Sequence, residues 1–94
     1  MPELPTQKPT LEEDIDSISD IASRVILYND DWHTFDEVIA QLIKAINCTY
    51  EQARALSFEV HVKGKAIVFS GTMPECLRVS SVLEEIALHT QIIT

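Results

Sequence analysis

The densest group of side chains able to do chemistry is the run Asn29–His33, with the sequence NDDWH. The only other interior candidate is His61. One interpretation of the run is an Asx-type turn whose carboxylates lie near a helix N-terminus, which stabilises a helix by about 0.5 kcal/mol per group. The other is a binding site, which requires Asn29, Asp30 and His61 to converge. Spacing along the sequence does not decide between the two.

A metal or catalytic site built from Asp30, Asp31, His33 and His61 is disfavoured. The histidines form no HxxH or HxxxH pair, and the sequence contains no Gly-rich phosphate loop and no nucleophile–base motif. We therefore expect no metal, no cofactor and no enzymatic activity.

Three capping signals mark the helices that would position these residues. Thr34, Thr49 and Thr72 each precede a Glu or Gln by three positions, the pattern of a capping box. Apolar residues then follow at steps of three and four. The patterns predict helices from Phe35 to about Asn47, from Tyr50 to about His61, and from Met73 through Ile86, with Gly64 in the left-handed position after the second.

Three β-rich runs precede, separate and follow these helices, at Arg24–Tyr28, Lys65–Phe69 and Gln91–Thr94. The resulting order is β-α-α-β-α-β. It predicts an α+β sandwich, in which a three-stranded antiparallel sheet packs on three helices.

Charge divides the 94 residues into a tail and a core. Residues 1–22 hold six acidic residues, one lysine and three of the four prolines. Such composition favours an acidic, mostly disordered and mobile N-terminal extension over residues 1–22, followed by one core domain over residues 23–94. Near-helical spacing of apolar residues leaves open a short helix formed on a partner, through Leu11, Ile15, Ile18 and Ile21.

The overall charge excludes several classes of partner. The formal net charge is −8 and the sequence pI is about 4.6, so binding to nucleic acid or to an anionic membrane is not expected. No apolar run approaches the roughly 20 residues that span a bilayer. Cys48 and Cys76 form no CxxC motif, and neither a secretory signal nor a basic transit segment precedes them. We expect a cytoplasmic monomer with reduced thiols.

Two strings together resemble the ClpS adaptor family. They are VILYNDD at residues 25–31 and VHVKGKA at residues 60–66, and the resemblance extends over roughly residues 24–93. Family members are small non-enzymatic adaptors that recognise N-terminal degron residues and deliver such proteins to a ClpA- or ClpC-type AAA+ unfoldase for ClpP proteolysis. Their fold is similar to the order of elements predicted above.

The resemblance implies an amine-binding site made of Asn29, Asp30 and His61, with Asp31 at the ligand backbone or holding the loop. The chemistry is suitable, because an α-ammonium group has three N–H donors and a pKa near about 7.7–8.0. An amide oxygen, a carboxylate and a neutral imidazole nitrogen are three acceptors for them.

The resemblance also implies a side-chain pocket for a bulky apolar first residue. Its expected lining is Phe35, Val38, Ser57, Val60 and Ile93, with Ile92 as the alternative to Ile93. Phe35 and Ser57 stand where methionines are common in the family, which changes the size and polarity of the pocket.

Arg78, with Glu75 as its acidic companion, matches the surface that relatives use to bind the unfoldase. The alternative function is that of a structural or interaction domain with a ribosomal-stalk-like fold and no amine pocket. Such a domain would not need the NDD run and His61 together.

Overall fold

The computed structural model describes residues 23–94, and the extension expected over residues 1–22 lies outside this range. The described chain forms three strands and three helices. In chain order they are β2 (Ser23–Tyr28), α2 (Phe35–Ile46), α3 (Tyr50–Lys63), β3 (Lys65–Gly71), α4 (Met73–Glu84) and β4 (Thr90–Ile93). The predicted α+β order is therefore confirmed.

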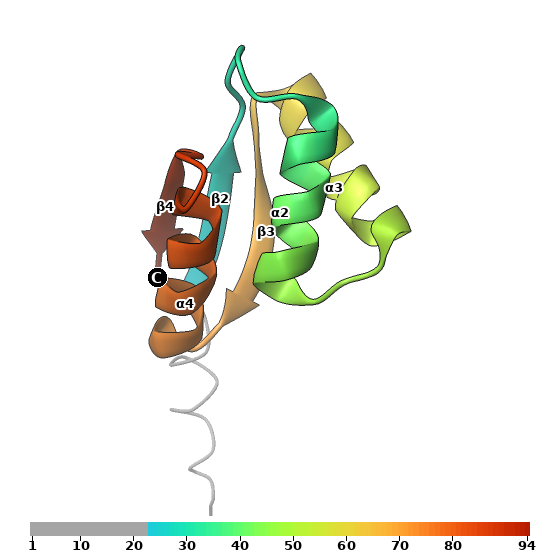
Figure 1. Cartoon of the computed structure of the whole chain (residues 1–94). Coiled ribbons are helices and arrows are strands. Elements are labelled where there is room, and N and C mark those ends of the chain that lie inside the picture. Colours follow the sequence, from blue (N-terminus) through green and yellow to red (C-terminus); the bar gives the residue numbers. More distant parts are fainter. Residues whose placement is uncertain (1–22) are drawn as a thin grey trace, which may run out of the picture.

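The three strands form one antiparallel sheet in the order β3-β2-β4. The register shifts between Val25 and Ile26, where β3 accommodates one extra residue. Figure 1 shows α4 lying along the sheet and α3 next to β3, while α2 lies against both α3 and α4. Alternation along β2 buries Val25 and Leu27 completely against the helices and leaves Ile26 and Tyr28 partly exposed.

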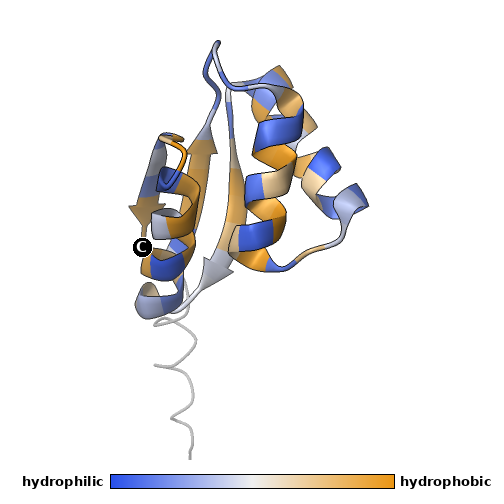
Figure 2. Ribbon diagram, in the orientation of Figure 1, coloured by the Kyte–Doolittle hydropathy of each residue, from blue (hydrophilic) through white to orange (hydrophobic). Residues whose placement is uncertain are grey.

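The hydrophobic residues are concentrated where the strands and helices pack together. Figure 2 shows them on β2, on β3 and along parts of the helices. The side chains that are least exposed and largest come from β2, α2 and α4, namely Leu27, Leu42, Leu83, Val25, Val79 and Cys76. The core thus lies between one face of the sheet and the three helices, with Ala53 and Val60 as the buried contribution of α3.

All three helices begin where the capping signals predicted. In each, the threonine hydroxyl accepts from the amide three residues later, and the Glu or Gln side chain accepts from the threonine amide. The ends differ somewhat from the predictions. Helix α3 continues to Lys63, beyond His61, and α4 stops at Glu84, before Ile86. Gly64 ends α3 with φ of 89°, a left-handed conformation that glycine adopts without steric cost.

None of the helices formed by residues 23–94 is both long enough and apolar enough to span a membrane.

Candidate functional site

A cavity of about 420 Å³ opens where β2 ends. Its walls come from the loop after β2, from the start of α2, from the second half of α3 and from the residue Leu88 before β4. The predicted site residues that line it are Asn29, Asp30, Asp31, Phe35, Val38, Ser57, Val60 and His61. Asn29 and His61 thus line one hollow although they are 32 positions apart in the sequence.

The polar part of the wall forms because β2 and α3 end side by side. The amide of Asn29 donates to the carbonyl of Gly64 at 2.9 Å, and the amide of Gly64 donates to the carbonyl of Val60 at 2.9 Å. These two bonds hold the start of the loop against the last turn of α3, which carries His61. The lining of the cavity therefore includes an amide, carboxylates and an imidazole.

Asp30 organises the loop. Its Oδ1 accepts from the amides of Trp32 at 3.1 Å and His33 at 2.9 Å, and its Oδ2 lies 2.6 Å from His33 Nδ1. Burial acts to raise the pKa of Asp30, but the bonds from His33 and Trp32 outweigh it and lower the pKa. Asp30 is therefore a carboxylate at neutral pH. It forms the Asx-type turn and lines the cavity at once, so the two interpretations of the NDD run are compatible.

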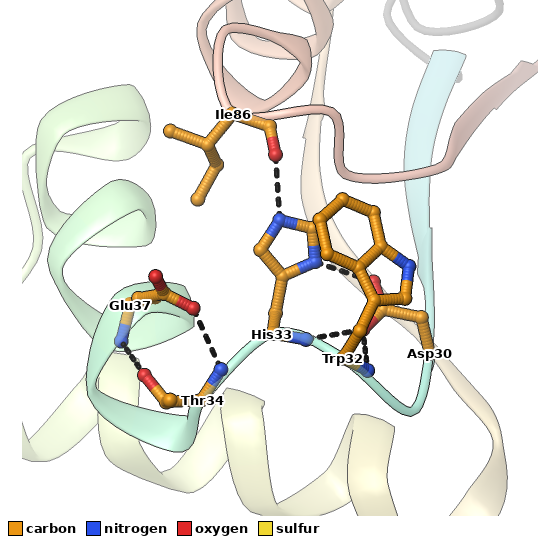
Figure 3. A network of polar contacts seen from close by, with 6 residues as sticks. All are labelled: Asp30, Trp32, His33, Thr34, Glu37 and Ile86. Carbon is orange, nitrogen blue, oxygen red and sulfur yellow. Dashed lines mark hydrogen bonds and ion pairs between the residues drawn. The ribbon is translucent and has the colours of Figure 1, made fainter.

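His33 also lines the cavity, although the sequence pattern indicated it only as a member of a disfavoured metal or catalytic site. Figure 3 shows its ring between Asp30 and the backbone of Ile86, with Trp32 lying against it. Nε2 is 2.5 Å from the Ile86 carbonyl oxygen, and only 4% of the side chain is exposed. The ring centroids of Trp32 and His33 are 3.9 Å apart. The sequence signal that could have indicated this contact is the aspartate three residues before the histidine within one turn.

Helix α2 begins directly after this loop. The hydroxyl of Thr34 accepts from the amide of Glu37 at 3.1 Å, and Glu37 Oε1 accepts from the amide of Thr34 at 2.7 Å (Figure 3). This capping box determines where the loop stops and places Phe35 in the first turn of α2.

The apolar part of the wall differs from the expectation at one position. Leu88, which is buried, lines the cavity. Ile93 does not line it, because it pairs with Arg24 at the other end of β2, whereas the cavity lies beyond Leu27 and Tyr28. Ile92 packs on the core.

The two residues that depart from the family pattern have contrasting environments. Phe35 lines the cavity and is 38% exposed. Ser57 is buried on α3, and its hydroxyl has no hydrogen-bond partner among residues 23–94. Val38 is half-buried and Val60 is buried, so both contribute apolar wall.

Arg78 and Glu75 lie on α4, away from the cavity. Arg78 Nη1 donates to the carbonyl of Ala45 in the last turn of α2 at 3.0 Å. Glu75 completes the capping box of α4 with Thr72, and this bonding lowers the pKa of the Glu75 carboxyl. Both residues are exposed and also have structural contacts.

Within residues 23–94, no cluster of three or more His, Cys, Asp or Glu side chains could hold a metal ion.

A family model and several relatives identify one family. The family model described as "ATP-dependent Clp protease adaptor protein ClpS" matches residues 20–91. The chain is 49% identical over 45 residues to the ClpS adaptor of Treponema denticola, covering 48% of this chain and 45% of that protein. It is 47% identical over 49 residues to ClpS of Thermosynechococcus vestitus, covering 51% and 52%.

A second group of relatives consists of much longer proteins. The chain is 33% identical over 70 residues to the E3 ubiquitin-protein ligase UBR1 of Drosophila melanogaster, which covers 73% of this chain and 4% of that protein. The matches thus span about half of the ClpS relatives and a small segment of the ligase.

Among solved structures, Agrobacterium tumefaciens ClpS2 bound to L-phenylalaninamide has the same fold. The TM-score is 0.68 at 18% identity, and the match covers 76% of this chain and 93% of that one.

Proposed function

Since this chain belongs to the ClpS family of Clp protease adaptors, we propose that it binds the free α-amino group and the bulky apolar side chain of an N-terminal degron residue. It would then deliver the bound protein to a ClpA- or ClpC-type AAA+ unfoldase for ClpP proteolysis. The observation that carries the proposal is the shared cavity of Asn29, Asp30 and His61, whose lining combines hydrogen-bond acceptors with apolar side chains.

The polar side suits an α-ammonium group. Asp30 Oδ2 has one hydrogen-bond partner, His33, and a carboxylate oxygen can accept a second. The Asn29 amide oxygen and a neutral His61 nitrogen supply two further acceptors. Charge-assisted bonds of this kind are stronger than neutral ones. Asp31 contacts the ligand backbone or holds the loop in this proposal.

The apolar side suits a large hydrophobic side chain. Phe35, Val38, Val60 and Leu88 provide its wall, and burying one large apolar side chain contributes about 1.5–3 kcal/mol. The similar fold of a ClpS2 that holds phenylalaninamide supports this assignment. Ser57 adds a small polar residue to the same wall. Ile93, which the resemblance also implied as a lining residue, is not part of it.

Delivery would use α4. The proposed unfoldase-binding residues are Arg78 and Glu75, which are both exposed. In this proposal the protein is a cytoplasmic monomer, has no catalytic activity of its own and acts with an unfoldase N-terminal domain as its partner.

Isothermal titration with peptides that differ only in the first residue tests the binding step. Peptides beginning with Phe, Leu, Tyr or Trp should bind, and those beginning with Gly or Ser should not. The matched control is the Phe peptide with an acetylated N-terminus, which lacks the charge and two of the three donors. Equal binding of the free and acetylated peptides, or of Leu and Ser peptides, would show that the site is not an amine-and-side-chain pocket.

A further inference from the structure

The ring of His33 lies between two oxygen atoms. Nδ1 is 2.6 Å from Asp30 Oδ2 and Nε2 is 2.5 Å from the Ile86 carbonyl oxygen. A carboxylate and a carbonyl can only accept, so each ring nitrogen must donate. A neutral imidazole has one donor and one lone pair, and only the doubly protonated imidazolium satisfies both contacts. The geometry therefore requires a charged ring.

The charges around the ring are consistent with this form. Asp30 faces it from the loop and Glu37 from the first turn of α2. Ile86 follows the C-terminal end of α4, where a helix carries partial negative charge. Trp32 covers one ring face, a favourable position next to a cation.

Two other acids at the end of α4 have partners of their own. Glu84 accepts from Ser80 and Thr90, and Glu85 accepts from Lys44 and Gln41. Burial acts to lower the pKa of His33, but the bonds to Asp30 and Ile86 and the charges of Asp30 and Glu37 raise it overall.

The imidazolium connects two walls of the cavity. Its Nδ1 contact holds the Asp30 carboxylate, whose other oxygen is already bound by the loop amides. Its Nε2 contact holds the turn between α4 and β4, and Leu88 follows Ile86 in that turn by two residues. The sequence separation of 53 residues makes this a tertiary link between the amine side and the side-chain side of the cavity.

We propose that His33 is a positioning residue of the binding site: its imidazolium holds Asp30 and the turn bearing Leu88 at once, and ligand affinity falls when His33 loses a proton. The predicted change in ligand affinity rests on the proposed function. In the neutral ring, whichever tautomer forms, a lone pair faces Oδ2 or the carbonyl, so one of the two contacts is lost. The cavity then loses either the placement of the carboxylate or that of the turn.

The test compares the native protein with His33→Phe and His33→Gln. The Phe variant keeps an aromatic ring against Trp32 but has no hydrogen-bond donor. The Gln variant keeps N–H donors, but they lie on one uncharged amide group. His89→Phe is the matched control, since His89 is exposed and its ring meets Tyr28 edge-on with centroids 4.9 Å apart. Melting temperatures establish that each variant is folded under the conditions of the titration.

The readout is the affinity for a Phe-initiated peptide between pH 5.5 and pH 9, expressed as the ratio of native to variant. This ratio cancels the titration of the ligand amine and of every other group that the native protein and the variant share. At the acid end we expect His33→Phe to bind about tenfold more weakly, the loss expected for one charge-assisted hydrogen bond. The ratio should fall as His33 deprotonates, because the neutral ring keeps only one of its two contacts, and His89→Phe should match the native protein throughout.

Nitrogen NMR of the His33 ring in the native protein gives a second measurement that needs no ligand and no variant. Both ring nitrogens should carry protons at neutral pH, and the ring should titrate above the usual histidine value of about 6.5. A ring with only one proton at neutral pH, or a native-to-variant ratio that does not change with pH, overturns the inference. If the native protein binds no Phe peptide, the proposed function fails, while the NMR titration still decides the protonation of His33.

Discussion

The amide of Asn29 donates to the carbonyl of Gly64 at 2.9 Å, and this bond joins the first residue after β2 to the residue that ends α3. It accounts for the proximity of Asn29 and His61, which are 32 positions apart in the sequence. The carbonyl of Gly64 points toward the loop because the residue has φ of 89°. The site therefore depends on a backbone conformation that few other residues adopt.

Gly64→Ala should lower the free energy of unfolding by about 1–2 kcal/mol through backbone strain alone, because an added Cβ meets no atom within 4 Å. Gly64→Asn is the control, since Asn tolerates the left-handed region better. Chemical denaturation measures both, and peptide affinity should fall in the same order. An alanine variant as stable as the native protein would contradict this account of the turn.

Asp30→Asn should weaken binding of a Phe-initiated peptide by about 1.5–3 kcal/mol, because a charge-assisted bond to the ammonium group is lost. Asp31→Asn removes the same charge from the next residue and serves as the matched control. Its effect should be smaller, since Asp31 is expected to contact the ligand backbone or hold the loop. Titration calorimetry of both variants checks this, and equal losses would mean that general charge, not a specific acceptor, drives binding.

The Asp30–His33 pair should make stability depend on pH in two directions. The lowered pKa of Asp30 contributes stability above the usual range of an aspartate, and this contribution disappears as pH falls through the folded-state pKa. The raised pKa of His33 contributes stability below about pH 6.5, the usual histidine value, and this contribution disappears as pH rises.

The difference in unfolding free energy between the native protein and His33→Phe should therefore be most favourable to the native protein between about pH 4 and pH 6.5. It should decrease on both sides. Denaturant titrations from pH 3 to pH 9 measure it, and the titrations of all other groups cancel in the difference. A difference that does not vary with pH would exclude an ion pair.

Ser57→Ala should leave stability unchanged or raise it by about 1 kcal/mol, because it removes a buried hydroxyl that has no partner. Ser80→Ala is the matched control. Ser80 is also a buried helix serine, but its hydroxyl bonds to Thr90 at 2.7 Å and Glu84 at 3.2 Å. That variant should be destabilised by about 1 kcal/mol. Melting curves compare the two, and a strongly destabilised Ser57→Ala would reveal a bond made by its hydroxyl.

The sequence by itself determined the elements whose signals are local. Each capping box lies within four residues, so Thr34, Thr49 and Thr72 could be identified as helix starts without knowledge of any distant contact. The same holds for Gly64, which ends α3. The order of strands and helices followed from these boundaries, and so did the position of the NDD run between β2 and α2.

Only the tertiary structure decided which distant residues share the cavity. Leu88 lines it and Ile93 does not, since the antiparallel pairing of β4 places Ile93 opposite Arg24, at the far end of β2 from the cavity. The partner of His33 Nε2 is likewise a backbone carbonyl 53 residues away, and every residue of the chain has a carbonyl. Such contacts have no sequence signature, because they depend on strand register and on helix packing, which arise from the summed burial of the whole core.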